Sequence, residues 1–304
     1  RSWHYYLESF IATGIGSKNK YDRKMRTAEA ELLHITKNEQ SSLLAITLLQ
    51  EKEEMKIPRE VVKHIIGDAI KDVVFGHLFP NPFIASAERT GTAIFRKELN
   101  FPRNRIFEEL SHTDNKINPI ELLFKIYKDY ALPVTTNVEF SRQLESISKQ
   151  KSIIAERYPD ILSDFADIIG GEYIIKNDKL SFIPRGKRIH LSMGESSSSV
   201  RSLLDIGYYL RHIAQIGDLL MIDEPELNLH PENQRRVARL FTRLVNIGLK
   251  VFVTTHSDYI IKELNTLIML NNKNNQRLVS IMNREGYKQE ETIFCDNIKV
   301  YIAE

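Results

Sequence analysis

Residues 218–231 read Asp-Leu-Leu-Met-Ile-Asp-Glu-Pro-Glu-Leu-Asn-Leu-His-Pro, an apolar run that ends in two adjacent acids, Asp223 and Glu224. A short continuous apolar run is typical of a strand buried in a parallel sheet. Such sheets bind ligands beyond the carboxyl ends of their strands, where both acids would lie. In a phosphoryl-transfer site, Asp223 would hold Mg²⁺ and Glu224 would polarise the attacking water. Taken alone, the acidic pair also fits a surface turn whose acids cap a helix.

A second apolar run, residues 248–255, is followed by His256. Helical patterns at 231–246 and 258–264 alternate with the two runs. This alternation predicts an α/β fold with a mainly parallel sheet and helices on both faces. Because neighbouring parallel strands end at the same edge, we expect His256 beside the acids, where an imidazole can hydrogen-bond a γ-phosphate oxygen and the attacking water. A purely structural histidine is the alternative.

Four serines at 196–199 precede a helical pattern at 200–213. Small hydroxyl residues at the amino end of a helix leave backbone N–H groups open to an anion, and the helix dipole adds to the attraction. A serine tract can equally be a flexible linker. Its position shortly before the acidic pair favours phosphate binding by Ser197, Ser198 and Ser199.

Together these residues resemble the ABC-type ATPase head shared by SMC, RecF and OLD-like proteins. The likeness covers residues 170–270 closely and 83–99 loosely. It implies that 218–224 is the Walker B strand with its catalytic glutamate, and that 254–257 is the H-loop. It also implies that 227–230 is the D-loop, which makes Asn228 and His230 candidate nucleotide ligands.

Three motifs of this family are altered here. Residues 197–203 lie where the Leu-Ser-Gly-Gly signature falls, with serines replacing glycines, and 191–195 (Leu-Ser-Met-Gly-Glu) is a rival match. Residues 85–91 would take the place of the Q-loop. The P-loop pattern is not found, since 14–18 (Gly-Ile-Gly-Ser-Lys) lacks its first glycine and reverses the Lys and Ser order. Because residue 1 is Arg, we expect a P-loop to precede this sequence, with a degenerate ATPase as the alternative.

Outside this region, the spacing of apolar residues predicts amphipathic helices within 21–79 and again within 96–168, with a short strand at 83–87 between them. Residues 172–183 predict a hairpin that turns at Asn177 and Asp178. A further hairpin is expected before Glu304. The resulting division is a mostly helical amino-terminal part of the ATPase lobe at 1–95, a helical insertion at 96–168 and a carboxy-terminal ATPase lobe at 169–304.

Composition excludes several classes. With 42% apolar and 27% charged residues, the chain is neither disordered nor fibrous. Its 42 Lys and Arg against 40 Asp and Glu give no overall electrostatic reason to bind nucleic acid or membrane, although a local basic patch remains open. The single cysteine, Cys295, excludes an internal disulfide and a cysteine-based zinc site. No apolar run reaches the ~20 residues of a membrane span, so we expect a cytoplasmic protein.

We therefore expect an ATPase that binds ATP and Mg²⁺ and closes its site by head-to-tail dimerisation or a larger homo-oligomer. The stretch 223–231 is most similar to the RecF- and OLD-like ATPases of bacteria, many of which serve in anti-phage defence. This resemblance implies a defence role with a nuclease or toxic effector as partner. A RecF-like DNA-repair ATPase and a non-hydrolysing scaffold are the alternatives, and nucleic acid stays open as a partner.

Overall fold

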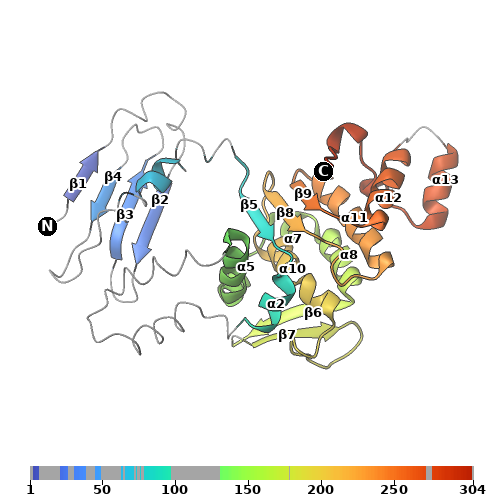
Figure 1. The fold of residues 1–304 in the computed structure, drawn as a ribbon, viewed down its shortest axis with the longest axis horizontal. Helices are drawn as coiled ribbons and strands as arrows, with labels where there is room; N and C mark the ends of the chain where they lie inside the picture. The colour runs from blue at the N-terminus through green and yellow to red at the C-terminus, as the bar shows by residue number, and fades with distance from the viewer. Residues whose placement is uncertain are drawn as a thin grey trace. The chain divides into compact units, whose positions relative to one another are not determined.

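The computed structural model describes residues 3–6, 21–26, 31–38, 45–48, 63, 66–71, 73, 76, 79–96, 131–177, 179–271 and 276–302. They fall into two compact units, Arg1–Asn81 and Pro82–Glu304 (Figure 1). The candidate P-loop remnant at 14–18 lies outside the described residues.

The first unit contains a four-stranded antiparallel sheet in the order β1-β4-β3-β2. Its strands are β1 (Trp3–Tyr6), β2 (Tyr21–Arg26), β3 (Glu31–Lys37) and β4 (Ala45–Leu48). The helical prediction is therefore wrong over 21–48, because cross-strand pairing such as Ile35 opposite Ile46 overrides the helix preference of a Lys- and Glu-rich sequence. Farther along, residues 66–71 are helical, and Ala69 and Val73 are buried as their spacing predicts.

The second unit is built on a parallel sheet in the order β5-β8-β9, which confirms the α/β class. The strands are β5 (Pro82–Ala85), β8 (Leu219–Asp223) and β9 (Lys250–Thr254). Helix α11 (Pro231–Asn246) connects β8 to β9, and α12 (Asp258–Met269) follows β9. In this register Asp223 lies opposite Thr254, so the predicted site residues leave the sheet at one edge.

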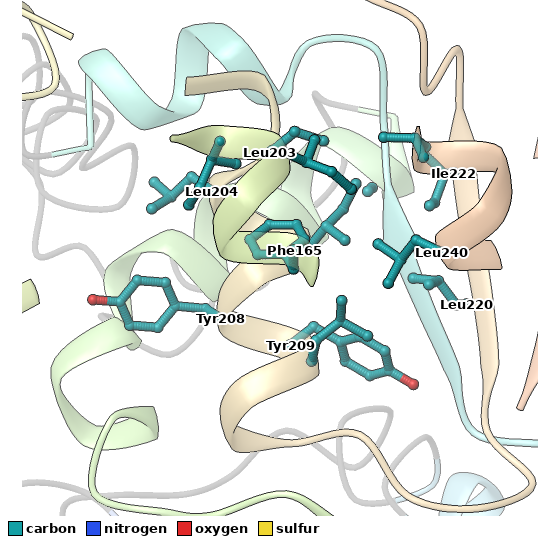
Figure 2. Packing of buried hydrophobic residues seen from close by; sticks show 14 of the residues in the cluster. Phe165, Leu203, Leu204, Tyr208, Tyr209, Leu220, Ile222 and Leu240 are labelled. Carbon is teal, nitrogen blue, oxygen red and sulfur yellow. The ribbon is translucent and has the colours of Figure 1, made fainter. Parts of the chain in front are cut away.

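The core of this unit packs against one face of the sheet (Figure 2). Leu220 and Ile222 of β8 contribute to it, together with residues of α8 (Pro159–Ile169), α10 (Leu204–His212) and α11. The labelled members are Phe165, Leu203, Leu204, Tyr208, Tyr209, Leu220, Ile222 and Leu240. The side chain of Phe252 on β9 lies outside this cluster and is 48% exposed.

Further helices lie between β5 and α8 in this unit. They are α2 (Arg89–Ile94), α5 (Leu132–Arg142), α6 (Leu144–Ile147) and α7 (Ile153–Arg157). Helix α5 packs directly beside β5. The buried Asn137 of α5 accepts from Ser86 N at 2.9 Å and donates to Ile84 O at 2.6 Å, so its amide satisfies the outer edge of β5 as a neighbouring strand would. The helical prediction holds for the described residues from 132 onward, and 97–130 lie outside them.

The predicted hairpin is confirmed as β6 (Gly171–Lys176) paired with β7 (Lys179–Pro184). Asn177 adopts a left-handed φ of 49° at its turn, and Asp178 lies outside the described residues. A glycine is required at 171, because a Cβ there would lie 2.2 Å from the carbonyl oxygen of Ile183. The hairpin leads to α9 (Ser198–Ser202), the first turns of the expected serine-tract helix.

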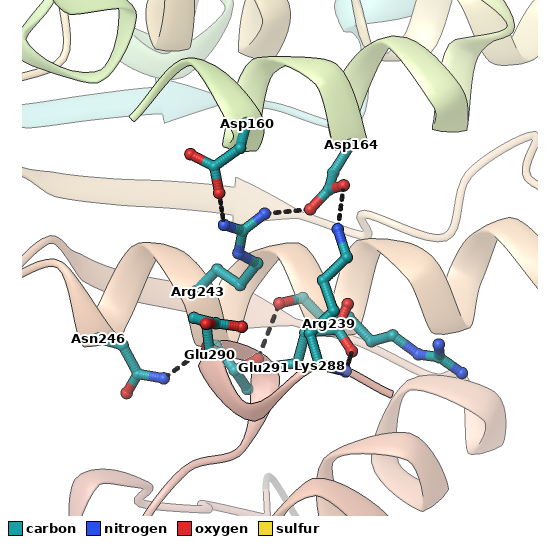
Figure 3. A network of polar contacts seen from close by, with 9 residues as sticks. Asp160, Asp164, Arg239, Arg243, Asn246, Lys288, Glu290 and Glu291 are labelled. Carbon is teal, nitrogen blue, oxygen red and sulfur yellow. Dashed lines mark hydrogen bonds and ion pairs between the residues drawn. The ribbon is translucent and has the colours of Figure 1, made fainter. Parts of the chain in front are cut away.

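The hairpin expected before Glu304 is wrong. The segment forms α13 (Gln276–Glu285) and the 3-10 turns η1 (Gln289–Glu291) and η2 (Cys295–Asn297). Polar contacts hold η1 in place of strand pairing (Figure 3): Asn246 donates to Glu290 O and Lys288 pairs with Asp164. Arg243, almost fully buried, pairs with both Asp160 and Asp164 and so joins α11 to α8.

Candidate functional site

The acidic pair lies at the carboxyl end of β8. Asp223 is exposed, and its Oδ1 accepts a hydrogen bond from Thr254 Oγ1 on β9. Glu224 N donates to Thr254 O at 3.1 Å. The backbone then leaves the strand, because Glu224 has a φ of 46°. A positive φ in a non-glycine residue costs ~1–3 kcal/mol and occurs in turns and at functional sites.

His256 is held at the same edge by Glu226. One carboxylate oxygen of Glu226 accepts from the backbone N of His256 at 2.7 Å, and the other accepts from Thr255 Oγ1 at 2.8 Å. These hydrogen bonds join the loops that follow β8 and β9, and they place His256 at the same edge as the acids, as expected. The imidazole itself is exposed. Glu226 was not among the predicted site residues, and its only sequence signal is its position two residues after the acidic pair.

The two candidate ligands in the intervening loop differ. Asn228 is exposed and has a φ of 61°. His230 caps α11, because its Nδ1 accepts from Glu232 N at 3.4 Å. Helix capping accounts for His230 in the structure, and nucleotide binding by either residue stays a prediction.

The serine tract forms a capped turn. Ser197 is the N-cap of α9, with Oγ accepting from Val200 N at 3.3 Å, and its Oγ lies 2.8 Å from that of Ser199. Ser198 is the first helical residue. Phosphate binding by these three serines stays a prediction.

The rival signature segment is part of the same turn. Ser196 Oγ donates to Ser192 O at 2.8 Å, and Arg201 donates to Met193 O at 3.2 Å. Glu195 in turn accepts from Ser192 N at 2.9 Å. The two signature candidates therefore form one hydrogen-bonded unit rather than separate sites.

Arg89 connects this unit to the acids. It lies in the stretch 85–91 that was predicted to take the place of the Q-loop, but its side chain was not among the predicted site residues. Its side chain is 1% exposed and donates to four main-chain carbonyls. Nε reaches Ser202 O at 2.7 Å, while Nη1 reaches Ser86 O at 2.8 Å and Asp223 O at 2.6 Å. Nη2 reaches Glu224 O at 2.8 Å. One guanidinium therefore joins the ends of β5, β8 and α9.

A buried carboxyl lies behind the site. Burial raises the pKa of Asp205 to about 7, and the charge of Arg89 and a hydrogen bond from Ser141 oppose this rise. Burial also lowers the pKa of Arg89, against the attraction of Asp205 and of the site acids. The interior behind the acidic pair thus contains a carboxyl and a guanidinium that influence each other.

The donor set at the edge fits Mg²⁺. The Asp223 carboxylate and the Thr254 hydroxyl supply oxygen ligands, which this ion prefers, and Mg²⁺ usually takes one or two protein ligands besides phosphates and water. Within the described residues, no group of three or more His, Cys, Asp or Glu side chains is arranged to hold a metal ion.

A family model described as an AAA ATPase domain matches residues 16–261. The chain belongs to this family. The resemblance to an ATPase head is thereby confirmed at the level of the AAA ATPase domain. Over 137 residues this AAA ATPase domain is 27% identical to UvrABC system protein A of Clostridium acetobutylicum, a match that spans 45% of the chain and 13% of that protein.

Two solved structures are also similar to parts of the domain. One comes from work on the ATP-driven dimerization and DNA stimulated activation of SMC ATPases. It is 19% identical with a TM-score of 0.27, and the match covers 41% of this chain and 76% of that one. The other is the Smc head domain bound to the C-terminal domain of ScpA, from Pyrococcus furiosus. It is 16% identical with a TM-score of 0.27, and the match covers 78% of this chain and 68% of that one. Across the residues that the structure describes, no helix is long and apolar enough to cross a membrane.

Proposed function

We propose that this AAA ATPase domain binds ATP with Mg²⁺ and hydrolyses it at the shared edge of β8 and β9. The observation that carries the proposal is the set of Arg89 hydrogen bonds, which hold the carbonyls of Asp223, Glu224 and Ser202 around one guanidinium. An acid pair and a candidate phosphate-binding turn are thereby fixed relative to each other.

Each side chain has a distinct task in this reaction. Asp223 holds the metal ion, which when bound neutralises charge on the phosphates. Glu224 accepts a proton from the attacking water, and its φ of 46° marks the point at which the backbone leaves β8. His256 hydrogen-bonds the γ-phosphate oxygens from the neighbouring loop.

The serine tract acts on the nucleotide of a second copy. Ser197 is exposed and caps a surface turn, so its hydroxyl and the N–H groups at the start of α9 can face a partner protomer. A head-to-tail dimer would place each tract over the other protomer's phosphates. Such composite sites couple turnover to assembly.

The biological role proposed with this activity is a bacterial anti-phage defence system in which the ATPase acts with a nuclease or toxic effector. Its support is the sequence of residues 223–231, which resembles RecF- and OLD-like ATPases. A RecF-like repair ATPase and a non-hydrolysing scaffold are the alternatives. Phage plating and survival after ultraviolet irradiation would be compared between cells with the wild-type protein and cells with an inactive variant. Loss of phage resistance would indicate defence, and loss of ultraviolet survival would indicate repair.

The decisive experiment compares Glu224→Gln with Glu232→Gln in the full-length protein. Glutamine keeps the shape of residue 224 but cannot take the proton, so turnover should fall by roughly a hundredfold or more while ATP binding is retained. Glu232 is half exposed in the first turn of α11 and pairs only with Arg236 among the described side chains, so its variant should retain activity. Equal turnover in both variants would reject Glu224 as the base, and no turnover by the wild type would favour the scaffold.

A further inference from the structure

The two loops that follow β8 and β9 are joined a second time, by the side chain of Gln234 near the start of α11. Its Nε2 donates to the carbonyl of Leu229 at 2.9 Å, and its Oε1 accepts from Ser257 Oγ at 2.6 Å. Leu229 and Ser257 are 7% and 8% exposed, so both partners of the amide are buried. One amide therefore joins the loop before α11 to the loop before α12.

The direction of each bond follows from the chemistry of the two partners. A main-chain carbonyl can only accept, so the amide nitrogen must face Leu229. The amide oxygen then faces Ser257, whose hydroxyl must donate. This hydroxyl keeps its lone pairs for the backbone N–H groups of Tyr259 and Ile260, which lie at 3.2 and 3.3 Å and begin α12. Glutamine can donate and accept here at once, whereas glutamate cannot donate and methionine has no amide.

The bonds of Gln234 close a ring with those of Glu226. One oxygen of the Glu226 carboxylate accepts from Thr255 Oγ1, which in turn accepts from Ser257 N at 3.0 Å. On the other side, Leu229 N donates to Glu226 O at 3.0 Å. The hydrogen-bonded ring therefore passes through Glu226, Leu229, Gln234, Ser257 and Thr255.

His256 is attached to this ring through its backbone. Its N–H donates to the second carboxylate oxygen of Glu226 at 2.7 Å. A single attachment at Glu226 would let the 227–230 loop rotate relative to His256. A second attachment at Gln234 restricts this rotation, because loops held at two points move together. Asn228, which is exposed and has a φ of 61°, lies in the loop that is held in this way.

We propose that Gln234 is a positioning residue for His256 and that it holds the 227–230 and 255–257 loops as one unit. The inference rests on the proposed ATPase function, in which His256 hydrogen-bonds the γ-phosphate. Gln234 takes no part in the chemistry, since both ends of its amide are engaged within the ring. Its loss should therefore slow the reaction of bound ATP and leave the binding of ATP unchanged.

The test is steady-state ATP hydrolysis by the full-length protein with Gln234→Met, which keeps the length of the side chain without its amide. We expect kcat to fall about tenfold and the KM for ATP to stay within about twofold, because a misplaced His256 weakens contacts made in the transition state. Gln143→Met is the matched control, since Gln143 is exposed between α5 and α6 and its side chain caps neither helix. Its kcat and KM should match those of the wild type.

Gln234→Glu separates positioning from the filling of space. Glutamate has nearly the same shape and can still accept from Ser257, but it cannot donate to Leu229, so the ring opens there. We expect kcat as low as in Gln234→Met, with urea unfolding showing that both variants are folded under the assay conditions. A wild-type kcat in Gln234→Glu would overturn the proposal, as would a loss of activity in either variant that lies entirely in KM.

Hydrogen exchange without nucleotide gives a readout that does not depend on hydrolysis. The backbone amides of His256 and Ser257 donate within the ring, so they should exchange at least about threefold faster in Gln234→Met and at the wild-type rate in Gln143→Met. Unchanged exchange in Gln234→Met would overturn the positioning role even if turnover fell. A wild type that hydrolyses no ATP would reject the proposed function, and the exchange rates would still decide whether Gln234 holds the two loops.

Discussion

Replacing Asp205 by asparagine should change how the stability of the protein depends on pH. Asp205 is 1% exposed, Ser141 donates to its Oδ1 at 3.4 Å, and its Oδ2 has no hydrogen-bond partner among the residues that the structure describes. Burial raises its pKa from 3.8 to about 7. The folded state therefore keeps this proton over a pH range in which the unfolded state has released it. The free energy of unfolding must then fall as pH rises from the unfolded pKa through the folded one.

The size of the loss follows from that pKa. At about 1.4 kcal/mol per pH unit, ionisation of Asp205 should cost the wild type roughly 2 to 3 kcal/mol between about pH 5 and pH 8. Asparagine keeps the shape without the titration, so the difference between the two proteins should change by this amount over the range. Other titrating groups contribute equally to both proteins and cancel.

Urea unfolding at several pH values measures this difference directly. Asp258→Asn is the control, because Asp258 is 83% exposed and pairs only with Lys262 among the described side chains. Its curve should run parallel to the wild type across this range. If the Asp205→Asn curve also runs parallel, the carboxyl is ionised throughout, and the picture of a protonated Asp205 behind the site is wrong.

Three further substitutions test the contacts around the edge of the sheet. In Arg89→Lys, the lysine cannot donate to four carbonyls at once. ATP turnover, measured in steady-state or stopped-flow assays, should fall at least about tenfold. The free energy of unfolding, measured by urea titration, should fall by roughly 2–4 kcal/mol. Glu226→Gln leaves one acceptor oxygen for two donors and should lower turnover about tenfold at a stability cost of roughly 1 kcal/mol; unchanged turnover would show that His256 needs no such support. Ser198→Arg should block ATP-dependent dimerisation in size-exclusion chromatography without unfolding the protein, and a dimer that persists would contradict closure by the serine tract.

The carboxy-terminal half of the fold was predictable because its periodicities are strong. The pattern at 231–246 gave α11 with the bounds that the structure has, Pro231–Asn246, since a proline begins the helix and apolar residues recur on one side. The strands at 21–48 were missed because their Lys- and Glu-rich sequence favours helix locally, whereas the structure pairs β2 with β3 and β3 with β4. The final segment was mistaken for a hairpin because side chains of α8 and α11 hold η1, and no local pattern encodes them.

In the candidate site, too, residues marked by a local sequence pattern were predicted, and contacts that no local pattern encodes were not. Asp223 and His256 were predicted as site residues because each stands at the end of an apolar run, which is a local signal. The role of the Arg89 side chain was not predicted, because its partners are main-chain carbonyls and any residue type can supply a carbonyl at those positions.

This choice of partners has a chemical consequence for the site. A guanidinium paired with the carboxylates themselves would neutralise the charge that a metal ion and a water molecule require. By binding carbonyls, Arg89 fixes the backbone of Asp223 and Glu224 and leaves the lone pairs of both side chains free of it. Its charge is balanced at a distance by Asp205 and the site acids. A lysine could match the charge but could not donate to four carbonyls at once, so this arrangement of the backbone around both acids requires arginine.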